Sequence, residues 1–307
     1  MKLVILVFVL WLIVIPAFSQ STKLPDLGYK PVPNFLVLAS GANFGEVAGI
    51  ALNSKGHIFI FNRGSKPLME FDGNGKFIRT LGDGLFKSAH GLRIDSKNNI
   101  WITDIGSHVV LKLSPEGRVL MVLGKIDWAG EFSEPRYGLP LFNAPTDVAF
   151  DSSGNIFVSD GYGNSRVMKF DKNGNFIKFW GKKGAAQGEF NLPHTIAIDA
   201  KDLVYVGDRE NKRIEIFDAD GKFIKEWTHV GYPYGITITP DQFLYMADGK
   251  NERILKMNLN GEILGALGEP GKGEGQFGWA HSVAVGSKGE IYVAEILNWR
   301  VQKFMKK

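Results

Sequence analysis

Short stretches of alternating apolar and polar residues recur along this chain from about residue 49 to residue 304. They are rich in Val, Ile, Phe and Tyr, and they are bounded by Asp, Asn and Gly, as in the segment DKNGNF. This pattern is typical of half-buried β-strands joined by tight hairpin turns. It therefore predicts an all-β protein.

The predicted strands fall into copies of one repeated unit. Most copies contain four short strands, and successive copies begin 40 to 56 residues apart. Both the strand content and the spacing are typical of one blade of a β-propeller. The copies begin at Gly49, Gly91, Asp147, Thr195, Gly235 and Ser282. We therefore predict a six-bladed β-propeller.

The two ends of the repeat region indicate how the ring closes. The last copy stops at Phe304 without an outer strand, whereas a strand predicted at Phe35–Leu38 has no repeat of its own. Pairing of these two elements would close the ring and protect an exposed edge. The longest spacing between copies contains an extra segment, Lys125 to Asn143, which we expect to form a loop on one face.

The first 19 residues differ in character from the rest. Lys2 precedes an apolar run from Leu3 to Phe18, followed by a small-x-small pattern that ends at Ser19. We interpret residues 1–19 as a cleaved signal peptide, because the run is shorter than the ~20 residues a membrane-spanning helix needs. We therefore expect a secreted or periplasmic protein with no stable membrane insertion after cleavage. Residues 20–34, with their prolines, are expected to be an extended lead-in, and residues 35–307 the propeller domain.

The composition of the chain limits the covalent links and binding partners that we expect. The chain has no cysteine and a formal net charge of +4, so disulfides and a lipid-modified cysteine are excluded. Lys and Arg are mixed with acids along the strands, unlike the basic stripe of a nucleic-acid-binding protein. We expect no nucleic-acid partner, and a monomer.

Three histidines occupy one register in alternate copies. His90, His194 and His281 each stand immediately before the predicted innermost strand of a copy. One such histidine would be a packed strand-end residue, but in a closed ring three alternate copies would direct them at the axis from three sides. Three imidazoles leave a coordination position open, as in catalytic zinc sites, although copper, iron and nickel also accept imidazole. Zinc is the favoured metal.

The remaining histidines, His57, His108 and His229, lie outside this register. We expect them at the surface or in turns.

Residues that recur at one register should build the frame, and residues that depart from it should carry the chemistry. Arg63 and Arg209 follow the second strand of their copies, where the other copies have Ile or Gly, and Tyr162 is the sole aromatic residue one position further on. Alone, each would be a solvated charge or a packed turn residue, but around three histidines they become candidate catalytic residues. The recurring set consists of the acids that close the second strand and the Asn-x-Arg motifs that follow them: Asp104, Asp160, Asp208, Asp248 and Glu295, with Asn164, Arg166, Asn211, Arg213, Asn251, Arg253, Asn298 and Arg300.

The contexts of the three histidines, together with the segments FNRG, DGYGNSR, PHTIAID and DREN, resemble the peptidyl-α-hydroxyglycine α-amidating lyases, which are propellers of NHL-type repeats. The resemblance covers roughly residues 45 to 304. It implies that the three matching histidines bind zinc and that Tyr162, Arg63 and Arg209 are catalytic or orient a peptide or small-molecule substrate. The implied reaction cleaves the C–N bond of an α-hydroxyglycine to give an amide and glyoxylate.

The resemblance also implies a structural calcium. Its main-chain ligands match Ile50 and Leu92, but its side-chain ligand is an Asp where this chain has Ser282. This difference weakens the expectation of calcium.

Two other functions fit the same pattern. A lactonase-like propeller hydrolase would hold its axial metal with Asp, Asn and Glu rather than His. A non-catalytic NHL propeller would bind a peptide, glycan or protein partner and need no metal. Analysis of the bound metal separates the three functions.

Overall fold

The computed structural model describes residues 24–130 and 140–307. The predicted signal peptide, and part of the segment from Lys125 to Asn143, lie outside these residues. Within them, the helical content is one 3₁₀ turn, η1 (Gly249–Asn251). No helix in this part of the chain is long and apolar enough to cross a membrane.

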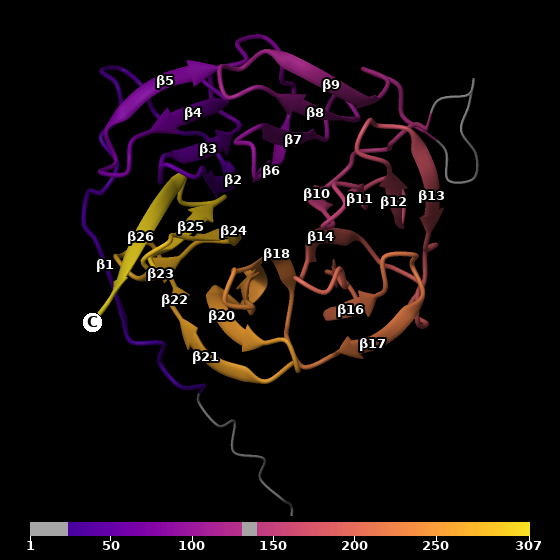
Figure 1. The fold of residues 1–307 in the computed structure, drawn as a ribbon. Helices are drawn as coiled ribbons and strands as arrows, with labels where there is room; N and C mark the ends of the chain where they lie inside the picture. The colour runs from indigo at the N-terminus through magenta and orange to yellow at the C-terminus, as the bar shows by residue number, and fades with distance from the viewer. Residues whose placement is uncertain (1–23, 131–139) are drawn as a thin grey trace, which may run out of the picture.

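Six four-stranded antiparallel sheets surround a central axis, as the sequence repeats predict (Figure 1). The first sheet contains β2 (Val47–Leu52), β3 (Ile58–Asn62), β4 (Leu68–Phe71) and β5 (Phe77–Leu81). The second contains β6 (Ala89–Ile94), β7 (Ile100–Asp104), β8 (Val109–Leu113) and β9 (Val119–Gly124). The third contains β10 (Asp147–Phe150), β11 (Ile156–Asp160), β12 (Arg166–Phe170) and β13 (Phe176–Trp180).

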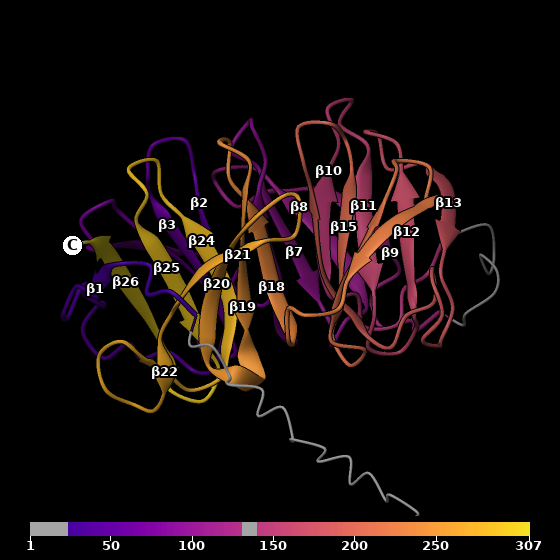
Figure 2. The same ribbon diagram turned by 90° about the horizontal axis from the view of Figure 1, so that it is seen from below.

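The other half of the ring repeats this order. The fourth sheet contains β14 (Pro193–Ile198), β15 (Val204–Asp208), β16 (Arg213–Phe217) and β17 (Phe223–Trp227). The fifth contains β18 (Pro233–Ile238), β19 (Phe243–Asp248), β20 (Arg253–Asn258) and β21 (Ile263–Leu267), and a short parallel pair follows it, β22 (Glu269–Pro270) and β23 (Gln276–Phe277). The sixth contains β24 (Ala280–Val285), β25 (Ile291–Glu295) and β26 (Arg300–Lys306). In each sheet the first of these strands lies nearest the axis (Figure 1), and Figure 2 shows the ring from the side.

The outer strand of the sixth sheet comes from the other end of the chain. It is β1 (Tyr29–Pro31), which pairs antiparallel with β26. The prediction that Phe35–Leu38 supplies this strand is wrong, and the lead-in is part of the propeller. Proline at position 31 is compatible with β1 because an outermost strand has no further neighbour that needs its N–H. Phe35, Leu36 and Leu38 instead pack over the core between the first and sixth sheets.

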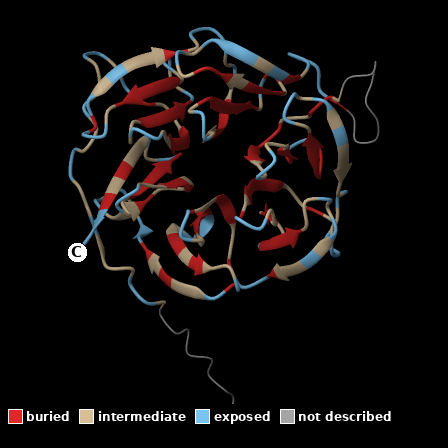
Figure 3. Ribbon diagram, in the orientation of Figure 1, coloured by how far each residue is buried: buried red, intermediate tan, exposed pale blue. Residues whose placement is uncertain are grey.

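Apolar side chains fill the spaces between neighbouring sheets. Six clusters of buried residues occur in the described chain, one for each pair of adjacent blades. The inner strands are therefore buried almost throughout, and exposure increases toward the outer strands (Figure 3). The resulting ring holds the axial ends of the innermost strands in fixed positions.

The recurring acids and Asn-x-Arg motifs build the frame, as expected. Asp160 accepts hydrogen bonds from Arg166 Nε at 3.0 Å, from Asn164 Nδ2 at 2.7 Å and from the Asn143 backbone N–H at 2.9 Å. Asp208, Asp248 and Glu295 make equivalent contacts in the next three sheets. Burial raises the pKa of the Asp160 carboxyl, and Arg166 opposes this shift.

Candidate metal and active site

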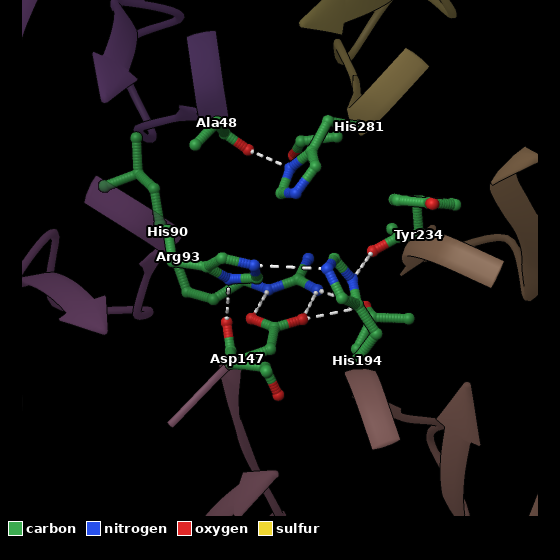
Figure 4. A pocket seen from close by; sticks show the side chains of 13 residues that line it. Ala48, His90, Arg93, Asp147, His194, Tyr234 and His281 are labelled. Carbon is green, nitrogen blue, oxygen red and sulfur yellow. Dashed lines mark hydrogen bonds and ion pairs between the residues drawn. The ribbon is translucent and has the colours of Figure 1, made fainter. Parts of the chain in front are cut away.

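β-Bulges direct the predicted histidines at the axis. In the fourth sheet, pairing passes from Pro193 to Thr195 and leaves His194 without a partner in β15. The same slip occurs at His90 in β6 and at His281 in β24. An extra residue bends the strand and re-aims its side chain. The three imidazoles thus meet on the axis (Figure 4).

Each imidazole is oriented by the neighbouring blade. The Nδ1 atoms of His90, His194 and His281 lie 2.7, 2.6 and 2.7 Å from main-chain carbonyl oxygens. Because a carbonyl can only accept a hydrogen bond, each Nδ1 is the protonated nitrogen and each Nε2 carries the lone pair. The acceptors belong to the residues that occupy the histidine register in the alternate blades: Thr146, Tyr234 and Ala48.

The donor set fits a metal ion. The ligand atoms of the three histidines lie within 4.8 Å of one another, and no other such cluster occurs in the described residues. Burial lowers the pKa of His90 to about 3, with Arg63 and Arg209 acting in the same direction. Burial likewise lowers the pKa of His194 and of His281 well below the ordinary value. Neutral imidazoles with second-nitrogen hydrogen bonds are the form that binds zinc and related metals.

Tyr162 completes the group at the axis. Its hydroxyl lies 3.1 Å from Nε2 of His90 and 3.1 Å from Nε2 of His194. The residue is 39% exposed, so its ring borders solvent while its hydroxyl faces the buried imidazoles. Burial raises the pKa of this phenol, and the nearby Arg209 and Arg63 oppose the shift.

The two arginines predicted from the sequence differ in their surroundings. The Arg209 guanidinium lies over the rings of Tyr162 and Tyr234, 5.7 and 4.7 Å from their centroids, and its Nε donates to Glu210 Oε1 at 2.8 Å. Its contact with a carboxylate uses Nε, and the side chain also interacts with the Tyr162 hydroxyl. Arg63 donates from Nη1 to Glu46 at 2.6 Å and from Nε to the Ala89 carbonyl at 3.1 Å. Arg209 is therefore the better placed to bind a carboxylate.

The chain is similar in sequence to several known proteins. The chain is 33% identical to peptidyl-glycine alpha-amidating monooxygenase B of Xenopus laevis, over 85% of this chain and 34% of that protein. It is 36% identical to a probable peptidyl-alpha-hydroxyglycine alpha-amidating lyase of Caenorhabditis elegans, over 56% of this chain and 55% of that one. Its homologues therefore include proteins named as amidating monooxygenases and amidating lyases. The chain spans only about a third of the length of the Xenopus relative, so activities of that whole protein are not transferred with the homology.

Solved structures and a family model match the fold of the chain. A family model described as a 6-bladed beta-propeller matches residues 141–260. A streptogramin B lyase structure superposes with a TM-score of 0.63 at 16% identity, covering 91% of this chain and 97% of the other. A gluconolactonase from Xanthomonas campestris superposes with a TM-score of 0.65 at 12% identity, covering 85% and 86%. At these identities the superpositions establish the propeller fold alone.

The structure brings only some of the positions that the resemblance implies for calcium to the axis. Leu92 and Ser282 line a small axial cavity with a volume of about 20 Å³ that the histidines also border, whereas Ile50 is not among its lining residues. The same cavity holds the side chains of Arg93 and Asp147 (Figure 4).

Tyr234 is a residue of the site that the sequence pattern did not indicate. It occupies the histidine register in the fifth blade, at a bulge between Pro233 and Gly235. It is 2% exposed and its ring lies 5.1 Å from that of His194. Extending the register to the alternate copies would have identified it.

The three histidines outside the register lie in turns or connecting segments and are at least partly exposed, as expected. His57 Nδ1 lies 2.8 Å from Glu70 Oε1, and His229 Nε2 lies 2.8 Å from the Gly261 carbonyl oxygen. His108 Nδ1 accepts the Ala144 backbone N–H at 3.0 Å.

Proposed function

We propose that this chain is a zinc-dependent lyase that cleaves the C–N bond of a peptidyl-α-hydroxyglycine or a similar α-hydroxy amide. The products are an amide and glyoxylate. The observation that carries the proposal is the convergence of three Nε2 lone pairs, each oriented by a carbonyl, beside the hydroxyl of Tyr162. The names of the homologues support the same reaction class.

The reaction needs no oxidant and no added water. The substrate hydroxyl loses its proton as the carbon–oxygen double bond forms, the C–N bond breaks, and the departing amide nitrogen takes up a proton. A zinc ion held by His90, His194 and His281 would supply Lewis acidity and lower the pKa of the substrate hydroxyl. The protein must then provide a proton acceptor and an anchor for the substrate.

Tyr162 is the proposed proton acceptor. Its hydroxyl is the polar side-chain group in contact with His90 and His194 at the axis. Burial raises the pKa of the phenol, but the guanidinium of Arg209 over its ring and the charge of Arg63 oppose this rise. The two arginines therefore favour the phenolate form that a base requires.

Arg209 is the proposed anchor for the substrate carboxylate. Its terminal nitrogens can form a bidentate pair with a carboxylate, and the stacked rings of Tyr162 and Tyr234 fix the plane of the guanidinium. Arg63, already paired with Glu46, would contribute mainly positive charge.

A lactonase-like hydrolase is the second candidate, since gluconolactonases share the fold. The axial ligand set argues against it. Lactonase-type sites use oxygen ligands, whereas the cluster here consists of three buried imidazoles.

The test combines metal analysis with a product assay. Protein purified without chelator should contain about one zinc per chain, and it should release glyoxylate from a peptide that ends in α-hydroxyglycine. The double variant His90→Ala/His194→Ala should lose the zinc and the glyoxylate release. It should remain folded, because apolar packing between the sheets holds the ring together. Metal-free wild-type protein would disprove zinc dependence. Zinc-loaded protein that releases no glyoxylate would disprove the lyase reaction.

A further inference from the structure

Two charged residues depart from the repeat at the axis. Arg93 lies in β6 at the position that the other innermost strands fill with Ala51, Ala149, Ala197, Thr237 and Ala284. Asp147 begins β10 at the position that the others fill with Gly49, Gly91, Thr195, Gly235 and Ser282. One blade therefore supplies an unmatched cation and the next blade an unmatched anion, in the same small cavity.

The two side chains form a bidentate ion pair. Arg93 Nε donates to Asp147 Oδ1 at 3.0 Å, and Nη2 donates to Oδ2 at 2.5 Å (Figure 4). Asp147 is 5% exposed, and its Oδ2 also accepts from Thr195 Oγ1 at 2.8 Å. The pair is thus largely withdrawn from solvent, where charges must be compensated locally.

The guanidinium also contacts the main chain of the opposite blades. Arg93 Nη2 lies 2.8 Å from the Ile236 carbonyl oxygen and 3.3 Å from that of Ile196. A carboxylate and inward-facing carbonyls are the oxygen ligands that calcium prefers. In this chain a guanidinium already occupies the space between them, so the cavity does not fit a calcium ion.

We infer that Arg93 is a built-in axial cation that takes the place of the calcium implied by the resemblance. The carboxylate that balances Arg93 also lies in a different blade from the calcium ligand that the resemblance implies. That ligand position is Ser282 in the sixth blade, whereas the only acid at this register is Asp147 in the third blade. The ion pair links the innermost strands β6, β10, β14 and β18 without a metal.

The ion pair also lies next to residues that contact or adjoin two of the histidines. Asp147 follows Thr146, whose carbonyl orients His90, and it binds Thr195, which follows His194. The inference does not depend on the lyase reaction, because it concerns cation binding and stability.

The test is calcium binding and thermal unfolding of the full chain as purified without chelator. Titration of wild-type protein with calcium chloride should give no binding at the axis and no rise in Tm. Arg93→Ala should lower Tm by roughly 10 °C, since it leaves a buried carboxylate unpaired. Added calcium should then bind at about one ion per chain and recover much of this loss. Arg93→Ala/Asp147→Asn should show no calcium response.

Arg166→Ala serves as the matched control. It also leaves a buried carboxylate, that of Asp160, but Asp160 does not line the axial cavity, so calcium should not restore its Tm. Stoichiometric calcium in wild-type protein that disappears in Asp147→Asn would overturn the inference. So would an Arg93→Ala protein that unfolds like the wild type and ignores calcium. If Arg93→Ala does not fold, the wild-type and Asp147→Asn titrations still decide the matter.

Discussion

Replacement of Tyr162 by phenylalanine separates catalysis from structure at the axis. The substitution removes one oxygen atom and leaves the ring, which packs edge-on against His90 and His194 with centroid distances of 5.2 and 5.7 Å. Arg209 retains its position over the ring. The lost contacts are those of the hydroxyl with the two Nε2 atoms, each at 3.1 Å.

The two expected effects differ in size. Loss of hydrogen bonds at a residue that is 39% exposed should cost about 1 kcal/mol of stability, which lowers Tm by roughly 2–4 °C in a domain of this size. Loss of a general base should lower kcat by about 10²- to 10⁴-fold, equivalent to about 3–5 kcal/mol in the activation barrier. The catalytic effect should therefore exceed the structural effect severalfold.

The assay is glyoxylate release from an α-hydroxyglycine-extended peptide, measured with zinc content and Tm for the same preparations. Tyr232→Phe is the matched control, because Tyr232 is a half-buried tyrosine stacked with Lys212 and Lys250 and away from the imidazoles. It should retain wild-type kcat. Equal turnover by Tyr162→Phe and wild type would refute the assignment of the base, and loss of zinc in Tyr162→Phe would refute the separation of roles.

Two further predictions concern buried charges in the frame. Burial raises the pKa of Glu215 to about 7 from an ordinary value of 4.5. The folded protein therefore keeps a proton that the unfolded chain releases, and stability should fall as pH rises through this window. In urea unfolding, Glu215→Gln should be more stable than wild type at pH 8 by at most about 3 kcal/mol, and the two proteins should have similar stability at pH 4. Identical pH dependence of stability in the two proteins would contradict this prediction. Arg166→Ala removes the buried, 3%-exposed partner of Asp160 and should lower the free energy of unfolding by about 3–5 kcal/mol. Activity per folded molecule should be unchanged. An unfolding curve like that of the wild type would show that the ion pair is dispensable.

The repeat pattern was sufficient to predict the fold and the convergence of the histidines, because both follow from copies that occupy equivalent places in a closed ring. The closing strand was assigned wrongly because Phe35–Leu38 is the more apolar segment, whereas an edge strand needs only free backbone groups, which Tyr29–Pro31 provides. The sequence does not show the bulges that aim His90, His194 and His281, since these depend on pairing with the next strand. Arg93 could have been found from its departure from the alanine register.

The N-terminal segment connects three blades across the seam of the ring. Asp26 bridges Ala266 in the fifth sheet, β1 pairs with β26 in the sixth, and Val37 bridges Lys76 in the first. Tyr29 thus meets Lys306, nearly the whole chain length away. Until the last strand is available, β1 has no partner, so folding must finish at the seam after the rest of the chain has been made. A chain that lacks Tyr29–Pro31 would leave the outer edge of β26 unpaired, and this edge could then pair with strands of other molecules.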